Sequence, residues 1–241
     1  MDGNHIDKRY FVEVFENCSL DDWQYEMRRE MQELLPGLYL GPFAVCRDVN
    51  TLKSHGVTHI LCLLDGNEVN LFQRTLEVAS QFNSHIIEIA DTHLQLLITH
   101  FPVASQFIRS GIDHGGKVLI CCNGGMSRSP CFAIAYIMET FNISFRDAYQ
   151  FVQARRLCIN PNEAFKSQLK EYEPIYMAAQ SQRQQSDHQQ QHQNGYTIQQ
   201  RQKRTQLMDD HDGFDMDDMR SDTKRRDYSS SSPSTTSTDF I

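Results

Sequence analysis

The sequence lacks two features of exported and membrane proteins. It has no uninterrupted apolar run long enough to span a bilayer, and residues 1–7 lack the apolar stretch of a signal peptide. Basic residues are also outnumbered, because 23 lysines and arginines stand against 31 acidic residues, a formal net charge of −8. Proteins that bind nucleic acids usually present a basic face. We therefore expect no membrane contact and no nucleic acid partner.

Cysteine is not scarce, but its pattern is not that of a disulfide scaffold. Secreted disulfide domains are short and dense in cysteine, whereas the seven cysteines here are odd in number and scattered among apolar neighbours. We expect reduced thiols in a cytoplasmic and nuclear protein. The seven are Cys18, Cys46, Cys62, Cys121, Cys122, Cys131 and Cys158.

The composition predicts one folded domain between two other segments. From about Ala179 the chain turns to glutamine and histidine runs, then to charged and serine-rich stretches. Such a segment cannot bury enough apolar surface to offset the entropy lost on ordering. The expected organisation is an N-terminal extension over 1–27, a domain over 28–178 and a disordered polar tail over 179–241.

Within the domain, two kinds of apolar pattern alternate. Short dense apolar runs predict buried strands over 38–40, 59–64, 86–90 and 118–122. Helical spacing predicts helices over 96–112 (with a kink or restart at Pro102), 130–140, 144–156 and 162–176. This alternation predicts an α/β fold with a central, mainly parallel sheet flanked by helices.

The stretch Cys122-Asn-Gly-Gly-Met-Ser-Arg-Ser-Pro130 carries the most information about function. A buried strand ends at Cys122, and a helix is expected to begin at Ser129 or Pro130. Small residues between a strand and a helix N-terminus let successive N–H groups converge on one anion. The expected phosphate-binding residues are Asn123, Gly124, Gly125, Met126, Ser127 and Arg128.

A thiol at the start of such a loop is a candidate nucleophile. The N–H groups and the Arg128 guanidinium would stabilise the thiolate of Cys122 and a bound phosphoryl group alike. Asp91 follows an apolar run at the same edge of the sheet, so it is the candidate general acid, although a loop aspartate is also a common cap. Ser129 would assist breakdown of a phosphocysteine, or cap the helix, or both. This chemistry requires no metal and no organic cofactor.

The ordered motifs resemble those of the dual-specificity phosphatases. Cys122 to Ser129 matches the family signature His-Cys-x-x-Gly-x-x-Arg-Ser, and Arg155-Arg156 with Asn160-Pro161-Asn162 matches its later Arg…Pro-Asn element. The resemblance implies that fold, with Cys122 as nucleophile, Arg128 as phosphate clamp and Asp91 as general acid. It also implies a shallow site that accepts phosphoserine, phosphothreonine and phosphotyrosine.

Some segments resemble more closely the serine/threonine/tyrosine-interacting branch, which consists of pseudophosphatases. That branch carries glycine at the position of the nucleophile, whereas this chain has Cys122; active relatives carry histidine before it, whereas this chain has Cys121. Two functions are therefore open: a phosphatase, or a module that binds without turnover. The resemblance implies phosphoproteins, MAP kinases or an F-box ubiquitin-ligase adaptor as partners, and a monomer. The segments are 31–42, 135–141 and 158–162.

A redox role for the neighbouring thiols is a further hypothesis. Cys121 or Cys131 would trap oxidised Cys122 as a disulfide. The alternative is that both are ordinary core cysteines, since vicinal disulfides are strained.

Overall fold

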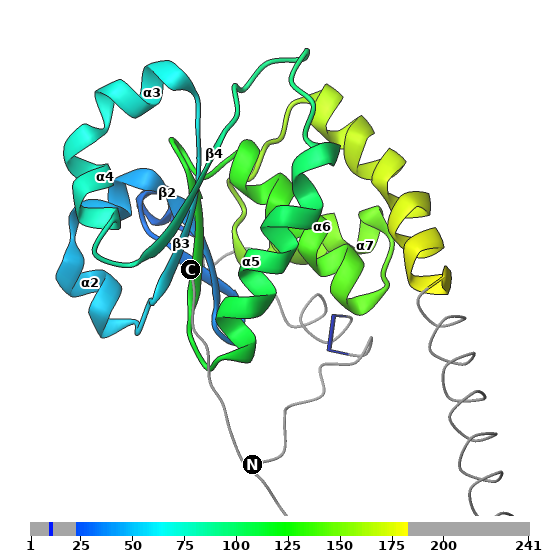
Figure 1. Cartoon of the computed structure of the whole chain (residues 1–241), viewed down its shortest axis with the longest axis horizontal. Helices are drawn as coiled ribbons and strands as arrows, with labels where there is room; N and C mark the ends of the chain where they lie inside the picture. The colour runs from blue at the N-terminus through cyan, green and yellow to red at the C-terminus, as the bar shows by residue number, and fades with distance from the viewer. Residues whose placement is uncertain (1–9, 12–22, 183–241) are drawn as a thin grey trace, which may run out of the picture. The chain divides into compact units, whose positions relative to one another are not determined.

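The computed structural model describes residues 10–11 and 23–182, and within them the strands form one sheet (Figure 1). The strands are β1 (Gln32–Leu35), β2 (Leu38–Pro42), β3 (His59–Leu64), β4 (Asn83–Glu88) and β5 (Val118–Cys122). Their order is β1-β2-β5-β3-β4; β1 and β2 are antiparallel, and the other neighbours are parallel. The predicted mainly parallel sheet is confirmed.

One predicted strand is displaced and one strand was not predicted. The apolar run predicted a strand over 86–90, but β4 occupies Asn83–Glu88. β4 lies at the edge of the described sheet and pairs with β3 through backbone groups, which do not require apolar side chains. The predicted strand was therefore wrong by three residues at its start and two at its end. β1 is short and only half apolar, which explains why its pattern gave no signal.

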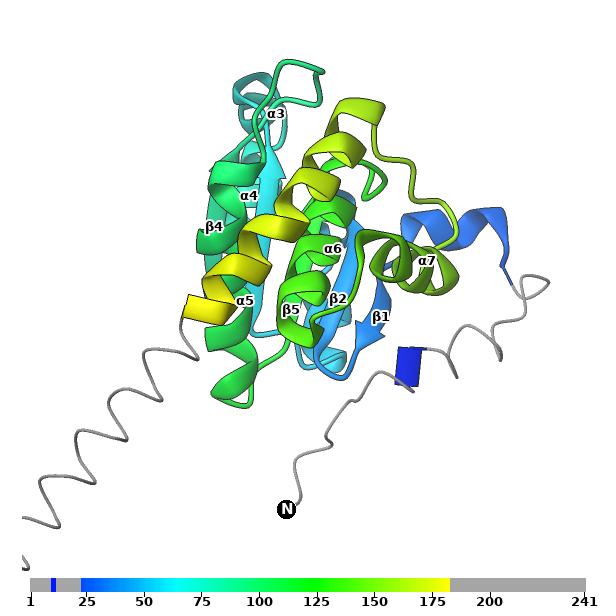
Figure 2. The same cartoon turned by 90° about the vertical axis from the view of Figure 1, so that its right-hand side faces the viewer.

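Helices cover both faces of this sheet. Figure 1 views the sheet nearly edge-on between two helical layers, and Figure 2 looks onto the layer of longer helices. The first layer contains η3 (Phe43–Arg47), α2 (Val49–Ser54), α3 (Gly66–Leu71) and α4 (Gln73–Ala79). The second contains α5 (Phe101–Asp113), α6 (Arg128–Phe141), α7 (Phe145–Arg155) and a helix over 163–182. A short 3-10 helix, η2 (Tyr25–Arg29), precedes β1.

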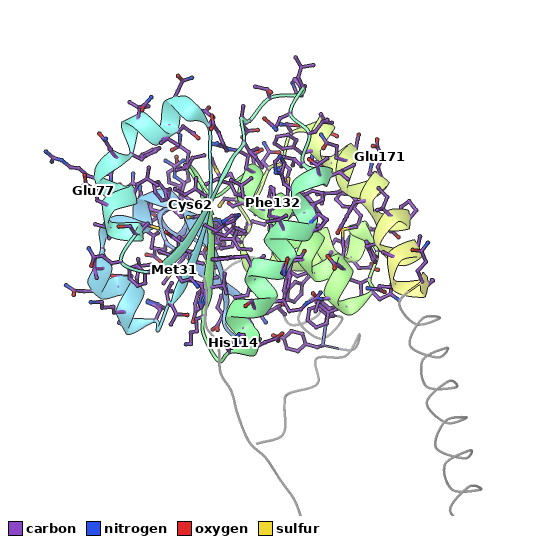
Figure 3. All side chains as sticks on the ribbon, viewed as in Figure 1. Met31, Cys62, Glu77, His114, Phe132 and Glu171 are labelled. Atoms are coloured by element: carbon purple, nitrogen blue, oxygen red, sulfur yellow. The ribbon has the colours of Figure 1, made fainter. Side chains whose placement is uncertain are left out.

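Strand alternation divides the core into two clusters. Successive side chains of a strand point to opposite faces. On β3, Leu61 and Leu63 pack under α5 and α6, whereas Ile60 and Cys62 pack under the shorter helices. Figure 3 labels one residue of each cluster, Cys62 and Phe132. The same division applies to β5, and it decides which of its two terminal cysteines is near the candidate site.

Pro102 marks a restart. The predicted helix over 96–112 is a 3-10 turn, η4 (Ile98–His100), followed by α5, which begins at Phe101. Proline fits the first turn of a helix because its missing N–H would have no partner there. The start predicted at residue 96 was therefore wrong, and the helix itself is confirmed. The remaining predicted helices, over 130–140, 144–156 and 162–176, correspond to α6, α7 and 163–182.

The ends of the domain extend slightly beyond the predicted limits. The last helix continues over 179–182, where the tail was expected to begin. Ahead of η2, Phe11 is buried, and its ring lies 4.7 Å from that of Phe151 on α7. Residues 1–9, 12–22 and 183–241 lie outside the described residues, so the predicted disorder of the tail stays a prediction. Among the described helices, none combines the length and apolar character needed to cross a membrane.

Candidate active site

The predicted loop joins β5 to α6 at the carboxyl end of the parallel strands. Gly125 takes a left-handed conformation, with φ of +64°, and its N–H donates to the Cys122 carbonyl at 3.2 Å. A Cβ atom at Gly125 would lie 2.5 Å from the backbone carbon of Gly41 on β2. Both the conformation and the close approach require glycine. The loop is therefore seated directly on the neighbouring strand.

Cys122 lies at the base of this loop. It is buried, and the hydroxyl of Ser129 donates to its sulfur with an Oγ–Sγ distance of 3.1 Å. Ser129 is fully buried in the first turn of α6, whose N-cap position is Ser127. Ser129 is therefore not the helix cap, and its hydroxyl is placed to stabilise a negative charge on the sulfur.

Arg128 is held in one orientation by a carboxylate. Its Nη1 and Nη2 atoms bind the two carboxylate oxygens of Glu68 at 2.5 and 2.8 Å, and Nη1 also donates to the Ile89 carbonyl at 3.0 Å. Burial alone would lower the pKa of Arg128, but Glu68 and the nearby Cys122 outweigh burial and raise it. The buried Nε has no hydrogen-bond partner among the described residues. An anion in the loop would supply that partner.

Glu68 is a site residue that the sequence analysis missed. It closes a capping box at the start of α3, where its carboxylate accepts from the Asp65 N–H at 3.0 Å, and it also accepts from the Asn123 amide at 2.8 Å. Burial alone would raise the pKa of Glu68, but the hydrogen bonds from Arg128, Asp65 and Asn123 hold it below its ordinary value. The Asp-x-x-Glu spacing signals a helix cap. It does not signal a contact with a residue 60 positions away.

Asp91 is brought to the loop from the segment after β4. One of its carboxylate oxygens accepts from the Ser127 hydroxyl at 2.9 Å and from the Asn162 amide at 3.0 Å. Asn162 also accepts from the Phe165 N–H at 3.0 Å at the start of the last helix. Two distant segments, the loop and the start of the last helix, therefore hold the exposed Asp91 beside the loop.

Arg156 binds the loop through the loop's backbone carbonyls. The side chain is fully buried, and it donates to the Gly125 carbonyl at 2.9 Å and to the Gly124 carbonyl at 3.4 Å. It also donates to the Arg28 and Glu30 carbonyls, each at 2.8 Å. Burial lowers the pKa of Arg156. Because a trans peptide points its N–H opposite to its C=O, holding the Gly125 carbonyl directs the next N–H away from Arg156.

The two neighbouring thiols differ in their position relative to Cys122. Cys121 points to the other face of the sheet, where its sulfur lies 3.6 Å from the Leu61 carbonyl and 3.9 Å from the Cys62 sulfur. The Cys131 sulfur lies 3.1 Å from the Ser127 carbonyl. Burial raises the pKa of both Cys121 and Cys131 well above the ordinary value. This geometry favours the core interpretation for Cys121, whereas Cys131 lies in the same cluster as Cys122, so its part in a disulfide trap stays a hypothesis.

The described residues contain no cluster of three or more histidine, cysteine, aspartate or glutamate side chains that could hold a metal ion. The groups brought together are a thiol, a hydroxyl, a guanidinium, a carboxylate and backbone N–H groups. That set can attack a phosphoryl group, stabilise its oxygens and protonate a leaving oxygen.

Comparisons with known proteins agree with this geometry. Residues 38–175 match the family "Dual specificity phosphatase, catalytic domain". The chain is 47% identical over 160 residues to the serine/threonine/tyrosine-interacting protein of Mus musculus, covering 66% of this chain and 71% of the relative. It is 38% identical over 143 residues to dual specificity protein phosphatase 22 of Mus musculus, covering 59% of this chain and 73% of the relative.

Solved structures show the same fold. The crystal structure of the human tyrosine phosphatase-like serine/threonine/tyrosine-interacting protein matches with a TM-score of 0.57 and 46% identity, covering 62% of this chain and 99% of the other. The crystal structure of DUSP15 matches with a TM-score of 0.54 and 28% identity, covering 66% of this chain and 96% of the other.

Proposed function

This chain belongs to the dual specificity phosphatase family, and from that premise we propose that it hydrolyses phosphotyrosine and phosphoserine or phosphothreonine in proteins through a phosphocysteine on Cys122. The observation that carries the proposal is the 3.1 Å contact from the Ser129 hydroxyl to the Cys122 sulfur, within a loop whose Arg128 Nε has no partner among the described residues. A thiol that served only as core packing would not need a hydroxyl donor.

In the first step, the Cys122 thiolate attacks phosphorus and the bond to the substrate oxygen breaks. The backbone N–H groups and Arg128 stabilise the equatorial oxygens of the transition state. Protonated Asp91 transfers its proton to the leaving oxygen, so the protein product departs as a neutral hydroxyl. The contacts from Ser127 and Asn162 keep the Asp91 carboxyl beside the loop for this transfer.

In the second step, water attacks the phosphocysteine and the sulfur–phosphorus bond breaks. The Asp91 carboxylate takes a proton from the water, and inorganic phosphate leaves. Cys122 departs as a thiolate, and the Ser129 hydroxyl donates a hydrogen bond to its developing charge. No proton, electron or co-reactant is needed beyond water and the groups named.

A second candidate function is binding without turnover. It is favoured by the 47% identity to serine/threonine/tyrosine-interacting proteins and by Cys121, which takes the place of the family's usual histidine and faces the other side of the sheet. On this alternative, the loop and its surroundings hold phosphoproteins such as MAP kinases, or an F-box ubiquitin-ligase adaptor. For either function we propose a monomer in the cytoplasm and the nucleus.

The two candidates are separated by turnover of an aryl phosphate and of a phosphoserine peptide by the reduced, full-length protein. An aryl phosphate has a good leaving group and makes little demand on the acid, whereas a phosphoserine peptide needs it. We expect Cys122→Ser to lose turnover of both substrates. We expect Asp91→Asn to lose about 10²- to 10⁴-fold on the peptide and much less on the aryl phosphate.

Wild-type turnover no greater than that of Cys122→Ser would contradict the enzymatic proposal. Retention of a phosphoprotein by the same preparation would then support the binding function. An Asp91→Asn variant equally impaired on both substrates would remove Asp91 from the role of acid while leaving Cys122 in place.

A further inference from the structure

We propose that three exposed apolar side chains beside the loop, Leu94, Leu96 and Met126, form a subsite for an apolar residue that flanks the phosphorylated residue of the substrate. We call these three residues the apolar rim. The inference rests on the proposed function in one respect, because it takes the phosphate loop as the place where the phosphorylated residue binds. It adds a preference for one class of peptide.

All three side chains of the rim are exposed. Leu94 is 94% exposed, Leu96 is 62% exposed and Met126 is 38% exposed. Single exposed apolar residues are common on protein surfaces, but neighbouring ones mark interaction sites more often. Here two leucines lie on one short segment and the methionine lies inside the phosphate loop, so the three share one end of the sheet.

The leucines are exposed on a segment that is held in place. The Gln95 side chain accepts from the Ala90 N–H at 3.2 Å, and the Gln95 carbonyl accepts from the Gln168 amide at 2.8 Å. Gln168 in turn accepts from the N–H of the buried Leu97 at 2.6 Å. These contacts fix the backbone at Gln95 and Leu97, on either side of Leu96 and next to Leu94. A pre-formed surface loses little entropy when a ligand binds.

The same segment begins at the candidate acid. Asp91 contacts Ser127, the residue after Met126, with an oxygen–oxygen distance of 2.9 Å. The segment after β4 rises at the end of the sheet that also carries α3, as both views show (Figures 1 and 2). A peptide whose phosphorylated residue enters the loop must therefore pass the Asp91 segment. Its neighbouring residues then lie over the apolar rim.

The charges around the rim add a second preference. Asp91 is exposed, and Glu163 follows Asn162, whose side-chain amide donates to Asp91. Lys166 Nζ pairs with Glu163 Oε1 at 2.8 Å, which leaves Asp91 as the acidic group next to the segment of Leu94 and Leu96. Acidic residues next to the phosphorylated residue would meet charges of their own sign. The surface therefore favours apolar flanks over acidic ones.

The test compares phosphotyrosine peptides that differ only in their flanks: leucine on the N-terminal side, leucine on the C-terminal side, alanine on both sides, or glutamate on both sides. Their affinities are measured by fluorescence anisotropy with full-length Cys122→Ser protein, which cannot turn the peptides over. We expect one leucine peptide to bind about tenfold more tightly than the alanine peptide, and the glutamate peptide to bind most weakly.

The variants assign this preference to the rim. In the Cys122→Ser background, Leu94→Ala with Leu96→Ala is expected to bring the leucine peptide within about twofold of the alanine peptide. Ile175→Ala is the matched control, because Ile175 is 49% exposed on the last helix and lies outside the rim. That control is expected to keep the full preference.

Equal affinity for leucine and alanine peptides, or a preference that survives the double substitution, would overturn the inference. So would a dimer in light scattering that dissociates in the double variant, because the leucines would then belong to a self-association face. Aryl phosphate turnover by wild-type protein reports on the proposed function separately. A leucine preference without turnover would support the rim together with the binding function.

Discussion

Cys121 and Cys122 are neighbours at the end of β5, yet they lie in two different environments. Cys122 faces the long helices, contacts the Ser129 hydroxyl and opens the phosphate loop. Cys121 faces the shorter helices and lies against Cys62, where burial raises the pKa of its thiol well above the ordinary value. The same side chain is thus placed for nucleophilic chemistry on one face and for packing on the other.

The surroundings, and not the residue type, distinguish the two thiols. A thiol is a useful nucleophile only where donors stabilise its anion. Around Cys122, residues from distant segments orient the groups that can stabilise its anion. Glu68 orients the Arg128 guanidinium, and Arg156 holds the loop by its carbonyls. Around Cys121 the described residues in contact with the thiol include no charged donor, and they are themselves buried in the apolar core.

The largest expected effect is a difference in turnover between variants of the two cysteines. Cys122→Ser should lower turnover of an aryl phosphate by at least about 10³-fold, because it replaces the attacking atom. Cys121→Ala should retain turnover within about threefold of the wild type, because its side chain faces the other cluster. Steady-state kinetics on variants with matched circular dichroism would check this. Equal losses in the two variants would contradict the separation of the two faces.

The next largest effect is expected on the stability of the protein when Arg156, which binds the loop that begins at Cys122, is replaced. Arg156→Ala should lower the free energy of unfolding by about 3–5 kcal/mol, because it leaves the Gly125 carbonyl, in a buried contact, and the Arg28 and Glu30 carbonyls, in partly buried contacts, without this donor. Urea denaturation would measure the loss. Arg156→Lys should recover only part of it, since an ammonium group cannot span the same carbonyls. A loss below about 1 kcal/mol would show that the loop does not depend on Arg156.

A smaller effect is expected at Glu68. Glu68→Gln should lower aryl phosphate turnover about tenfold, because Arg128 loses the carboxylate that orients it. The pKa of Glu68 is lowered in the folded protein, so its contribution to stability is complete above the unfolded pKa of about 4.3. That contribution is lost as the pH falls through the lower folded pKa.

Urea titrations of wild type and Glu68→Gln across this acidic range would check the pH dependence. The stability difference between the two proteins should be constant near neutral pH and should narrow below about pH 4.3. A difference that stays constant down to the acid limit would mean that the Glu68–Arg128 pair does not stabilise the fold.

The smallest effect is expected on the Cys121 face. Cys121→Ala should cost about 1 kcal/mol of unfolding free energy, since it removes one buried sulfur from an apolar cluster. The rate per folded molecule should be unchanged. Thermal unfolding together with turnover would separate the two quantities. A large loss of turnover at unchanged stability would connect Cys121 to the loop after all.

The parts of the fold that sequence predicted well are those with a local signature. Dense apolar runs marked β3 and β5, and the glycines before Ser129 and Pro130 marked the loop between a strand and a helix. Asp91 follows an apolar run at the edge of the sheet where the loop predicts an anion site, and this position makes it the candidate acid. The structure brings Asp91 to Ser127, whereas its role as the acid stays a prediction.

The parts that sequence did not predict lack such a signature. The helices α2, α3 and α4 have six or seven residues each, which is too short for a clear helical period. Glu68 reaches Arg128 across 60 positions, and no local pattern reports a contact at that separation. The alternation along β5 was in the sequence, and it would have placed Cys121 and Cys122 on opposite faces.

The most direct test of the account is to trap the phosphocysteine. Wild-type and Ser129→Ala proteins are mixed with an aryl phosphate, quenched in acid and mapped by mass spectrometry. The account predicts one phosphoryl group on Cys122 and none on Cys121, with more of it in Ser129→Ala, because loss of the hydroxyl slows departure of the thiolate. Turnover of the aryl phosphate with no phosphoryl group on Cys122 in either protein would contradict it.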